Sequence, residues 1–319
     1  RAQPLGRLTR VACGMTDPNP DSAVATAAAT VLAPDDARAV AALAERARDV
    51  LSTVLTHASV RRFEAEPVPE EVVWALEAAL VRGPTSSALH SYTHVIVREP
   101  ERKRRIAQLA GDQPWIDHAP LLIVGCADLR RAREVTHGQG YRYTAHDLRM
   151  LVSATADLTV GLQNASLVAQ SLGFGSVLLG GVLNGSLEIA QLLGLPLVGL
   201  SVGRPRGGHW PSPRPRLPLP LLVQHERWTL DANAERALLE AHDAATRERG
   251  DFEGRRIPWP AMGLGGEDPV PLGAYGWLEH TGRKQGRATW LAQGAKVDID
   301  LPAQGLCVRS TGDADETGP

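Results

Sequence analysis

Two arginines stand two residues apart in the proline-rich stretch PSPRPRLP, residues 211–218. Arg214 and Arg216 flank Pro215, and because proline fixes φ, the segment is predicted to be extended and stiff. Side chains at i and i+2 of an extended chain point to the same side. Both guanidinium groups are therefore expected to reach one place, and their planar donors suit a phosphate or another anion.

Three other short stretches carry groups that suit anions or flat ligands. THASVRRF and GPTSSALH contain imidazole, hydroxyl and guanidinium groups, and LLGG places two glycines where a strand meets a helix. Adjacent glycines let a flat ligand approach backbone N–H groups closely. Each stretch also has an ordinary structural interpretation as a helix cap, a turn or a solvated surface. The residues concerned are His57, Ser59, Arg61, Thr85, Ser86, Ser87, Gly180 and Gly181.

The usual catalytic signatures are absent from the sequence. GFGSVL lacks the third glycine of a dinucleotide-binding fingerprint and precedes its strand. GLSVG, residues 199–203, has the spacing of a nucleophile elbow, but the RPRGGHWPSPRP after it cannot form the helix that such a serine needs. The sequence has no HExxH, no close pairing of His with Cys and no glycine–lysine phosphate loop, so a metal site is unsupported.

Composition narrows the class of protein. The 319 residues are 43% hydrophobic with a formal net charge of −2, which favours a sizeable core and argues against general nucleic-acid binding. Three scattered cysteines without a CxxC favour a reducing cytoplasm. No apolar run approaches the roughly 20 residues of a membrane span. Residues 1–34 are interpreted as a flexible arm, because Asp17 and Asp21 precede AVATAAATVLA where a secretion signal needs positive charge.

Hydrophobic periodicity predicts helices and strands in uneven alternation. The longest helix is expected from Thr144 to Leu172, ending at Gly173, and the apolar run at 120–128 is typical of a buried strand. After about residue 250 the abundance of Gly, Pro and Arg predicts only short ordered pieces. Further helices are expected at 35–55, 69–82, 101–110, 186–194 and 232–249, and further strands at 93–99, 176–181 and 197–203.

Over about residues 50 to 260 the chain resembles the FMN-dependent nitroreductase superfamily, in particular its oxygen-insensitive NADPH nitroreductase and NADPH–flavin oxidoreductase branch. The resemblance rests on five pieces in order: HASVRRF, PTSS, LAGDQPWIDHAPLLIVGCADLRR, GLQNASLVAQSLGFGSVLLGGVLN and VGRPRGGHWPSPRPRLP. It implies an α+β, nitroreductase-like fold with a central, mostly antiparallel sheet flanked by helices, in an intertwined homodimer. We expect an arm at 1–34, an FMN-binding core at 35–240, and a C-terminal excursion with an NADPH-binding arginine loop at 241–319.

The resemblance also implies which residues bind FMN. The first piece would contact the FMN phosphate, ribityl chain or ring edge, and the serine loop with Gln113 would hydrogen-bond the ribityl chain or the isoalloxazine ring. The backbone of the glycine pair would face the flavin near N5, and the two proline-flanked arginines would hold the phosphate. Two positions depart from the family pattern: Ala58 stands where the family has arginine, and His90 where it usually has glutamine. The matching residues are His57, Ser59, Arg61, Ser86, Ser87, Gln113, Gly180, Gly181, Arg214 and Arg216.

For function, the resemblance implies an FMN-dependent NADPH oxidoreductase with ping-pong hydride transfer through flavin N5. Its acceptor would be a small molecule, a nitroaromatic, a quinone or a flavin, and no side chain is assigned acid or base work. In ERGDFEGRRIPW, Arg249 and Arg255 would pair with the NADPH 2′-phosphate, although a solvated basic loop is an equal interpretation. Two alternatives stay open: a flavin-binding sensor or sequestration protein with little turnover, and an FMN-dependent dehydrogenase of a biosynthetic intermediate.

Overall fold

The chain forms two compact units in a computed structural model that describes residues 48–144, 147–193, 196–213, 216–224 and 231–303. The first, which we call the sheet unit, contains residues 49–213 and the described residues from 297 onward. The second, the C-terminal unit, contains residues 216–224 and 231–296. The expected arm at 1–34 lies outside the described residues. The expected functional boundary at residue 240 falls within a helix of the C-terminal unit and stays a prediction.

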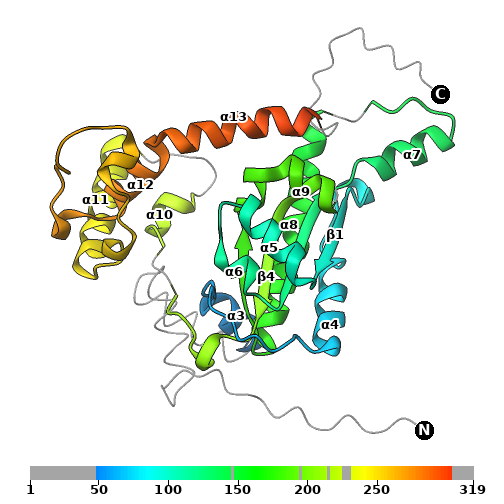
Figure 1. Cartoon of the computed structure of the whole chain (residues 1–319), viewed down its shortest axis with the longest axis horizontal. Helices are drawn as coiled ribbons and strands as arrows, with labels where there is room; N and C mark the ends of the chain where they lie inside the picture. Colours follow the sequence, from blue (N-terminus) through cyan, green and yellow to red (C-terminus); the bar gives the residue numbers. More distant parts are fainter. Residues whose placement is uncertain (1–47, 145–146, 194–195, 214–215, 225–230, 304–319) are drawn as a thin grey trace. The chain divides into compact units, whose positions relative to one another are not determined.

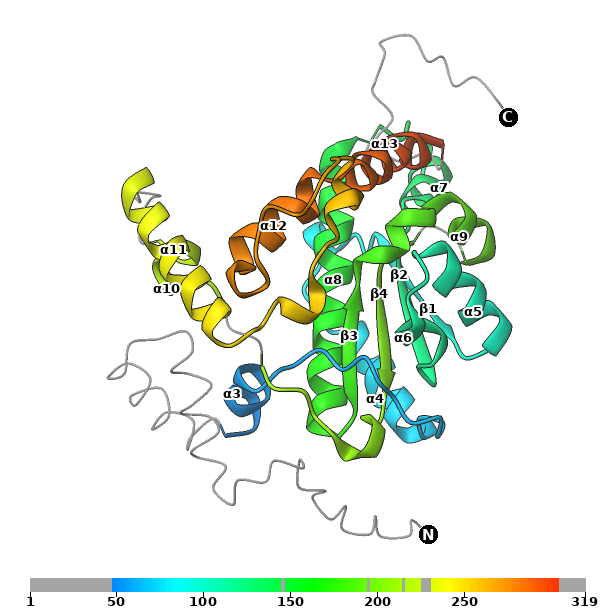
Figure 2. The same cartoon turned by 60° about the vertical axis from the view of Figure 1, so that its left-hand side comes forward.

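A four-stranded sheet is the framework of the sheet unit (Figures 1 and 2). The strands lie in the order β1-β2-β4-β3, and each neighbouring pair is antiparallel, which confirms the α+β class and the antiparallel sheet. Every residue of β2 is buried, as the apolar run predicted, because this strand has a neighbour on each edge and helices on both faces. The strands are β1 (Tyr92–Val97), β2 (Leu121–Ala127), β3 (Gly175–Leu179) and β4 (Pro196–Gly203).

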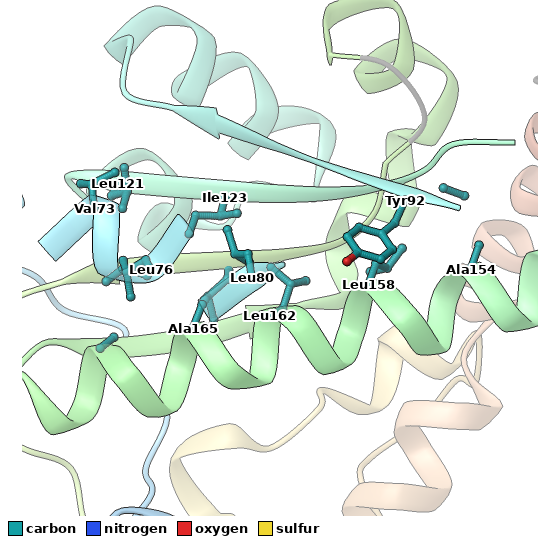
Figure 3. Close-up of a cluster of buried hydrophobic side chains, with 14 of the residues drawn as sticks. Val73, Leu76, Leu80, Tyr92, Leu121, Ile123, Ala154, Leu158, Leu162 and Ala165 are labelled. Carbon is teal, nitrogen blue, oxygen red and sulfur yellow. The ribbon is translucent and has the colours of Figure 1, made fainter. Parts of the chain in front are cut away.

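One face of the sheet packs against α4 (Glu70–Leu80) and the long helix α8 (Leu148–Ser171). Asp147 caps α8 by accepting a hydrogen bond from the Met150 N–H at 3.0 Å, and the chain leaves the helix through Gly173, whose φ of +80° favours glycine. Figure 3 shows apolar side chains of α8 pointing at α4 and the strands, with Leu158 and Leu162 in the middle. The predicted long helix is confirmed, with its first turn four residues later than expected.

The opposite face carries shorter helices and a second apolar core, to which β2 contributes Leu122 and Val124. Glu99 caps helix α5 (Pro100–Leu109): its carboxylate accepts hydrogen bonds from the backbone N–H groups of Glu101 and Arg102. The helices are α5 (Pro100–Leu109), α6 (Pro114–Asp117) and α9 (Ser186–Leu193).

Other elements of the sheet unit are short. Of the helix expected at 35–55, residues 48–55 are described and form the whole of α3, while residues 35–47 lie outside the described residues. A basic helix that periodicity did not predict, α7, follows β2. The elements are α3 (Arg48–Leu55), α7 (Arg130–Gly138) and the 3-10 turns η1 (Ser86–Ala88), η2 (Gly180–Gly185) and η3 (Arg206–Gly208).

The C-terminal unit is more helical than its composition predicted. The expectation of only short ordered pieces after residue 250 was wrong, because two helices, α12 and α13, follow the Gly- and Pro-rich stretch. The start of α12 is capped from another helix: Asp243 Oδ1 accepts from the Leu278 N–H at 2.7 Å, and Thr246 Oγ1 accepts from the Trp277 N–H. A cap supplied from more than thirty residues away leaves no local sequence signal.

The elements of this unit are α10 (Leu219–Leu222), α11 (Ala232–Glu248), the 3-10 turns η4 (Glu253–Arg255), η5 (Trp259–Met262) and η6 (Leu272–Ala274), α12 (Trp277–Gly286) and α13 (Ala288–Ala303). Helix α13 begins in the C-terminal unit, and its residues from 297 onward belong to the sheet unit. Across the described parts of both units, no helix combines the length and the apolar character that a membrane crossing requires.

Candidate functional site

An extended segment ahead of the first strand presents three of the predicted residues on one side. The side chains alternate: Ala58 and Val60 are buried, whereas His57, Ser59 and Arg61 are only partly buried. The Val60 N–H donates to the Ser176 carbonyl of β3 at 2.9 Å, so the segment lies along this strand. Ala58 therefore occupies the side opposite the three polar residues, and its departure from the family pattern does not interrupt them.

The imidazole of His57 is oriented by Gln170 in the last turn of α8. The Gln170 amide nitrogen donates to the Thr53 carbonyl at 2.8 Å and to Thr56 Oγ1 at 3.2 Å, which leaves its Oε1 to accept. His57 Nδ1 lies 3.0 Å from that oxygen and therefore carries the proton. The other ring nitrogen, Nε2, accepts a hydrogen bond when the ring is neutral and donates one when it is protonated.

Arg61 connects this segment to helix α6. Its guanidinium carbon lies 5.6 Å from the centroid of the Trp115 ring, within the range of a cation–π contact. Trp115 follows Gln113 by two residues, and Gln113 stands at the N-terminal boundary of α6. The structure thus brings the segment that carries His57, Ser59 and Arg61 close to the predicted amide of Gln113.

Gln113 in turn lies against the predicted glycine pair. A Cβ atom on Gly181 would come within 1.9 Å of Gln113 Nε2 and 2.8 Å of the Ala110 carbonyl oxygen, so only glycine fits there. A Cβ on Gly180 would meet nothing within 4 Å, and Gly180 is exposed. The pair therefore has two roles: Gly181 permits close packing, and Gly180 presents open backbone.

A residue that sequence reasoning did not assign to the site also holds this turn. Asn184 donates from Nδ2 to the Ala110 carbonyl at 3.1 Å, the same carbonyl that accepts from Gln113 at 2.9 Å. The spacing Gly-Gly-x-x-Asn was the available signal, since it places the amide one turn after the glycine pair.

The serine loop is held in a different way. Asp157, a buried carboxylate of α8, accepts from the Ser86 N–H at 2.9 Å and from the Ser86 hydroxyl at 3.0 Å. Ser87 and His90 have φ values of +51° and +49°, in the left-handed region that non-glycine residues rarely adopt. Arg131 of α7 donates to the His90 carbonyl at 2.8 Å and fixes the far end of the loop. A contact of Ser86 or Ser87 with a cofactor stays a prediction.

The remaining predicted residues belong to the C-terminal unit or lie outside the described residues. Arg249 follows α11 and pairs with Asp251, with Nη2 to Oδ2 at 2.9 Å. Arg255 ends the turn η4 and is exposed, as is Arg216. Arg214 lies outside the described residues, so the same-side arrangement predicted for Arg214 and Arg216 stays a prediction.

The described cysteine, Cys126, is not a candidate nucleophile. Burial in β2 raises the pKa of its thiol to about 12, and its Sγ lies 3.8 Å from the Val124 carbonyl oxygen. The thiol therefore stays protonated at neutral pH.

Taken together, the sheet unit has the antiparallel α+β framework and the polar groups expected of a flavin-type cofactor site. The family model "Nitroreductase family" matches residues 54–204. The FMN reductase [NAD(P)H] of Bacillus subtilis (strain 168) is 32% identical over 208 residues, which cover 63% of this chain and 82% of the relative. The chain therefore belongs to the nitroreductase family.

Other relatives and solved structures agree. The NADPH-flavin oxidoreductase of Vibrio harveyi is 29% identical over 185 residues, 56% of this chain and 75% of the relative. The solved structure of the NfrA1 nitroreductase from B. subtilis superposes with a TM-score of 0.68 at 23% identity, covering 81% of this chain and 99% of that one. The superposition confirms the nitroreductase-like fold.

Proposed function

We propose that this protein is an FMN-dependent NADPH oxidoreductase that reduces small-molecule acceptors. The observation that carries the proposal is the series of contacts from Arg61 through Trp115 of α6 and the adjoining Gln113 to Gly181. His57 lies on the same segment as Arg61 and is oriented by Gln170 of α8, so donors that suit an anion share one unit with the open backbone of Gly180. FMN combines a phosphate with a flat ring, and the donor set fits both parts. The relatives named FMN reductase and NADPH-flavin oxidoreductase support the same cofactor and co-substrate.

The residues of the sheet unit have distinct roles in this proposal. His57, Ser59 and Arg61 bind the phosphate, the ribityl chain or the ring edge, and Gln113 donates to the ribityl chain or the ring. The exposed backbone at Gly180 faces the ring near N5, where its missing side chain allows close approach. When bound, FMN supplies the atom that accepts and returns a hydride.

The remaining FMN contacts are proposed from the family pattern. Ser86 and Ser87 would reach the ribityl chain or the ring from the loop that Asp157 holds. Arg214 and Arg216 would bind the phosphate through their guanidinium groups.

Arginines of the C-terminal unit determine the preference for NADPH. Arg255 is exposed and would pair with the 2′-phosphate, a group that NADH lacks. Arg249 would leave its ion pair with Asp251 and bind the same phosphate. The free energy lost is small, because an exposed ion pair contributes at most about 1 kcal/mol. We propose a ping-pong order, in which NADP⁺ leaves before a nitroaromatic, quinone or flavin enters.

A second copy of the chain completes the functional protein in this proposal. The sheet unit exposes large apolar side chains on several elements, among them Trp74 on α4 with 63% of its surface exposed. Exposed apolar area of this kind is typical of interaction surfaces. We propose that a homodimer covers at least part of it. These side chains include Val50, Val54, Trp74, Val81, Leu148, Val152, Val160, Leu172 and Leu178.

Steady-state kinetics test the proposed function. NADPH oxidation by the full chain is measured with added FMN and a simple quinone, with both substrates varied. We expect turnover with a family of parallel double-reciprocal lines. Intersecting lines would disprove the ping-pong order, and NADPH oxidation no faster than in the absence of the protein would favour a flavin-binding sensor.

A further inference from the structure

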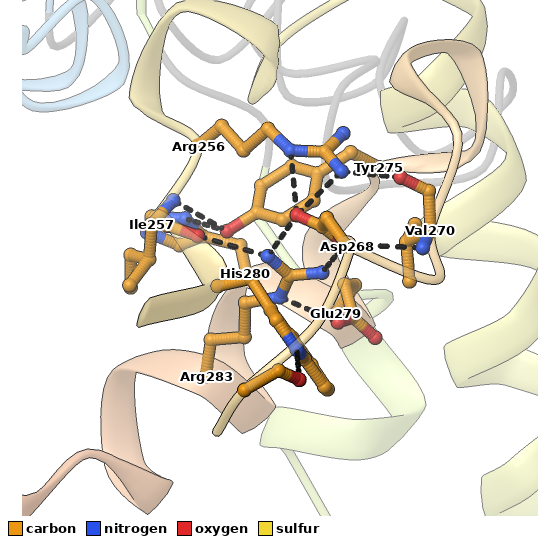
Figure 4. Close-up of polar contacts among 10 residues, drawn as sticks. Arg256, Ile257, Asp268, Val270, Tyr275, Glu279, His280 and Arg283 are labelled. Carbon is orange, nitrogen blue, oxygen red and sulfur yellow. Dashed lines mark hydrogen bonds and ion pairs between the residues drawn. The ribbon is translucent and has the colours of Figure 1, made fainter. Parts of the chain in front are cut away.

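The centre of the C-terminal unit is a buried tyrosine surrounded by charge (Figure 4). Tyr275 is 1% exposed, and the guanidinium carbons of Arg256 and Arg283 each lie 5.1 Å from the centroid of its ring. Asp268 accepts from both Nη atoms of Arg283, at 2.7 and 2.6 Å, and from Arg256 Nε at 3.1 Å. Glu279 accepts from Arg283 Nε at 2.6 Å. We call Arg256, Asp268, Tyr275, Glu279 and Arg283 the arginine–tyrosine cluster.

The cluster holds the backbone directly after Arg255. The Ile257 N–H donates to the Tyr275 hydroxyl at 3.0 Å, and the Ile257 carbonyl accepts from Arg283 Nη1 at 2.9 Å. Both backbone groups of one residue are thus bonded to side chains that follow it by 18 and 26 residues. The segment would otherwise be free to move, because the preceding 3-10 turn is only three residues long.

His280 holds the other side of the same turn. Its Nδ1 lies 3.3 Å from the Tyr275 hydroxyl, and its ring lies 4.9 Å from that of Phe252, centroid to centroid. The residue proposed to contact the 2′-phosphate is therefore fixed from both sides by groups that need not touch a nucleotide.

We infer that the arginine–tyrosine cluster positions Arg255 for the 2′-phosphate and so determines the preference for NADPH over NADH. The inference rests on the proposed function. Its physical basis is preorganisation: a loop already fixed in its binding conformation loses little conformational freedom when the nucleotide arrives. Asp268 is the critical member, because its carboxylate bridges the two arginines and its removal leaves Arg283 with a weaker partner.

The test is Asp268→Asn, with Glu267→Gln as the matched control. Both changes remove one negative charge, but Glu267 is the exposed neighbour outside the cluster. We expect Asp268→Asn to raise KM for NADPH about tenfold with kcat unchanged, and to leave KM for NADH within about twofold, because only the contact with the 2′-phosphate is weakened. We expect the control to behave like the wild type. The inference would be overturned if Asp268→Asn raised KM equally for NADPH and NADH, or if Glu267→Gln had the same effect as Asp268→Asn.

Hydrogen exchange measures loop order without any nucleotide. In Asp268→Asn we expect the amide of Ile257 to exchange at least about tenfold faster, while amides of β2 keep their wild-type rates. Unchanged exchange at Ile257 would overturn the inference. Tyr275→Phe is the second variant in case Asp268→Asn does not fold, since it removes only the hydroxyl that accepts from Ile257. It is expected to show the same pattern with a smaller loss of selectivity, about threefold, and wild-type selectivity in this variant would also overturn the inference.

A double-mutant cycle with Arg255→Ala separates this inference from the proposed function. If the cluster acts through Arg255, Asp268→Asn causes no further loss of selectivity in the Arg255→Ala background. Additive losses would overturn the inference and leave the assignment of Arg255 intact. Wild-type selectivity in Arg255→Ala alone would overturn that assignment and the inference with it.

Discussion

The two units of this protein are stabilised by different means. The sheet unit has two apolar cores, one on each face of its sheet. The C-terminal unit is centred on Tyr275, which is surrounded by arginine, aspartate, glutamate and histidine side chains. Apolar packing tolerates change in the surrounding loops, whereas a charged cluster depends on each partner being present. The cofactor site is therefore expected to be robust, and the nucleotide preference sensitive to single substitutions.

The largest expected effect lies in the apolar core. Leu162 of α8 is fully buried, and Leu162→Ala is expected to lower the free energy of unfolding by about 2–5 kcal/mol, because it removes packing and leaves a cavity. Urea denaturation followed by circular dichroism measures it. Val160→Ala, two residues away and 38% exposed, is the control, with a loss below about 1 kcal/mol. Equal losses in the two variants would contradict the described packing.

The next largest effects are expected from alanine substitutions at Gly180 and Gly181. Gly181→Ala is expected to destabilise the sheet unit by about 1–3 kcal/mol, since its Cβ would come within 2.8 Å of the Ala110 carbonyl oxygen as well as overlapping the Gln113 side chain. Gly180→Ala is expected to leave stability within about 0.5 kcal/mol while weakening FMN binding, because its methyl group enters open space that the ring would use. Denaturation and a fluorescence titration with FMN check both. A stable Gly181→Ala that binds FMN normally would contradict the geometry.

Histidines make stability depend on pH in both units. Burial lowers the pKa of His94, His242 and His280, and nearby cations lower that of His280 further. In the unfolded chain histidine takes up a proton near pH 6.5, so below that pH the unfolded state binds more protons than the folded state. The free energy of unfolding should therefore fall between pH 7 and pH 5, and level off below the folded pKa values. His242→Phe should reduce the slope, and a pH-independent urea midpoint would contradict this account.

The smallest expected effect concerns the exposed pair of Arg249 and Asp251. Asp251→Asn frees Arg249 without disturbing the arginine–tyrosine cluster, and we expect KM for NADPH to change by less than about threefold, since exposed pairs contribute little. Steady-state kinetics with NADPH and NADH measure it beside Asp268→Asn. An increase in KM for NADPH as large as that in Asp268→Asn would show that the Arg249–Asp251 pair matters as much as the ion pairs of the arginine–tyrosine cluster.

Much of the sheet unit was predictable from sequence, because its elements follow apolar periodicity. The buried strand at 120–128 and the helix that ends at Gly173 depend on local signals. The groups that orient the candidate site residues were not predictable. Gln170 lies 113 residues from the histidine that it orients, and Asp157 lies 71 residues from the serine that it holds. Such pairs exist only once the chain has folded.

The C-terminal unit was less predictable for the same reason. Helix α12 begins at Trp277, directly after a glycine, and takes its caps from α11, so the sequence carries no start signal there. Asp268 and Arg283 are 15 residues apart, with a turn and a helix start between them, and each alone has the pattern of a solvated surface charge. Composition indicated an irregular segment, whereas specific ion pairs order it.

The most direct test is a visible absorption spectrum of the purified full chain with FMN, before and after anaerobic addition of NADPH or NADH. We predict a yellow protein whose flavin absorbance is bleached by NADPH and much more slowly by NADH, with this difference lost in Arg255→Ala. A yellow protein bleached at equal rates by both nucleotides would contradict the role of Arg255. A chain that cannot take up added FMN, or whose bound FMN neither nucleotide reduces, would contradict the account as a whole.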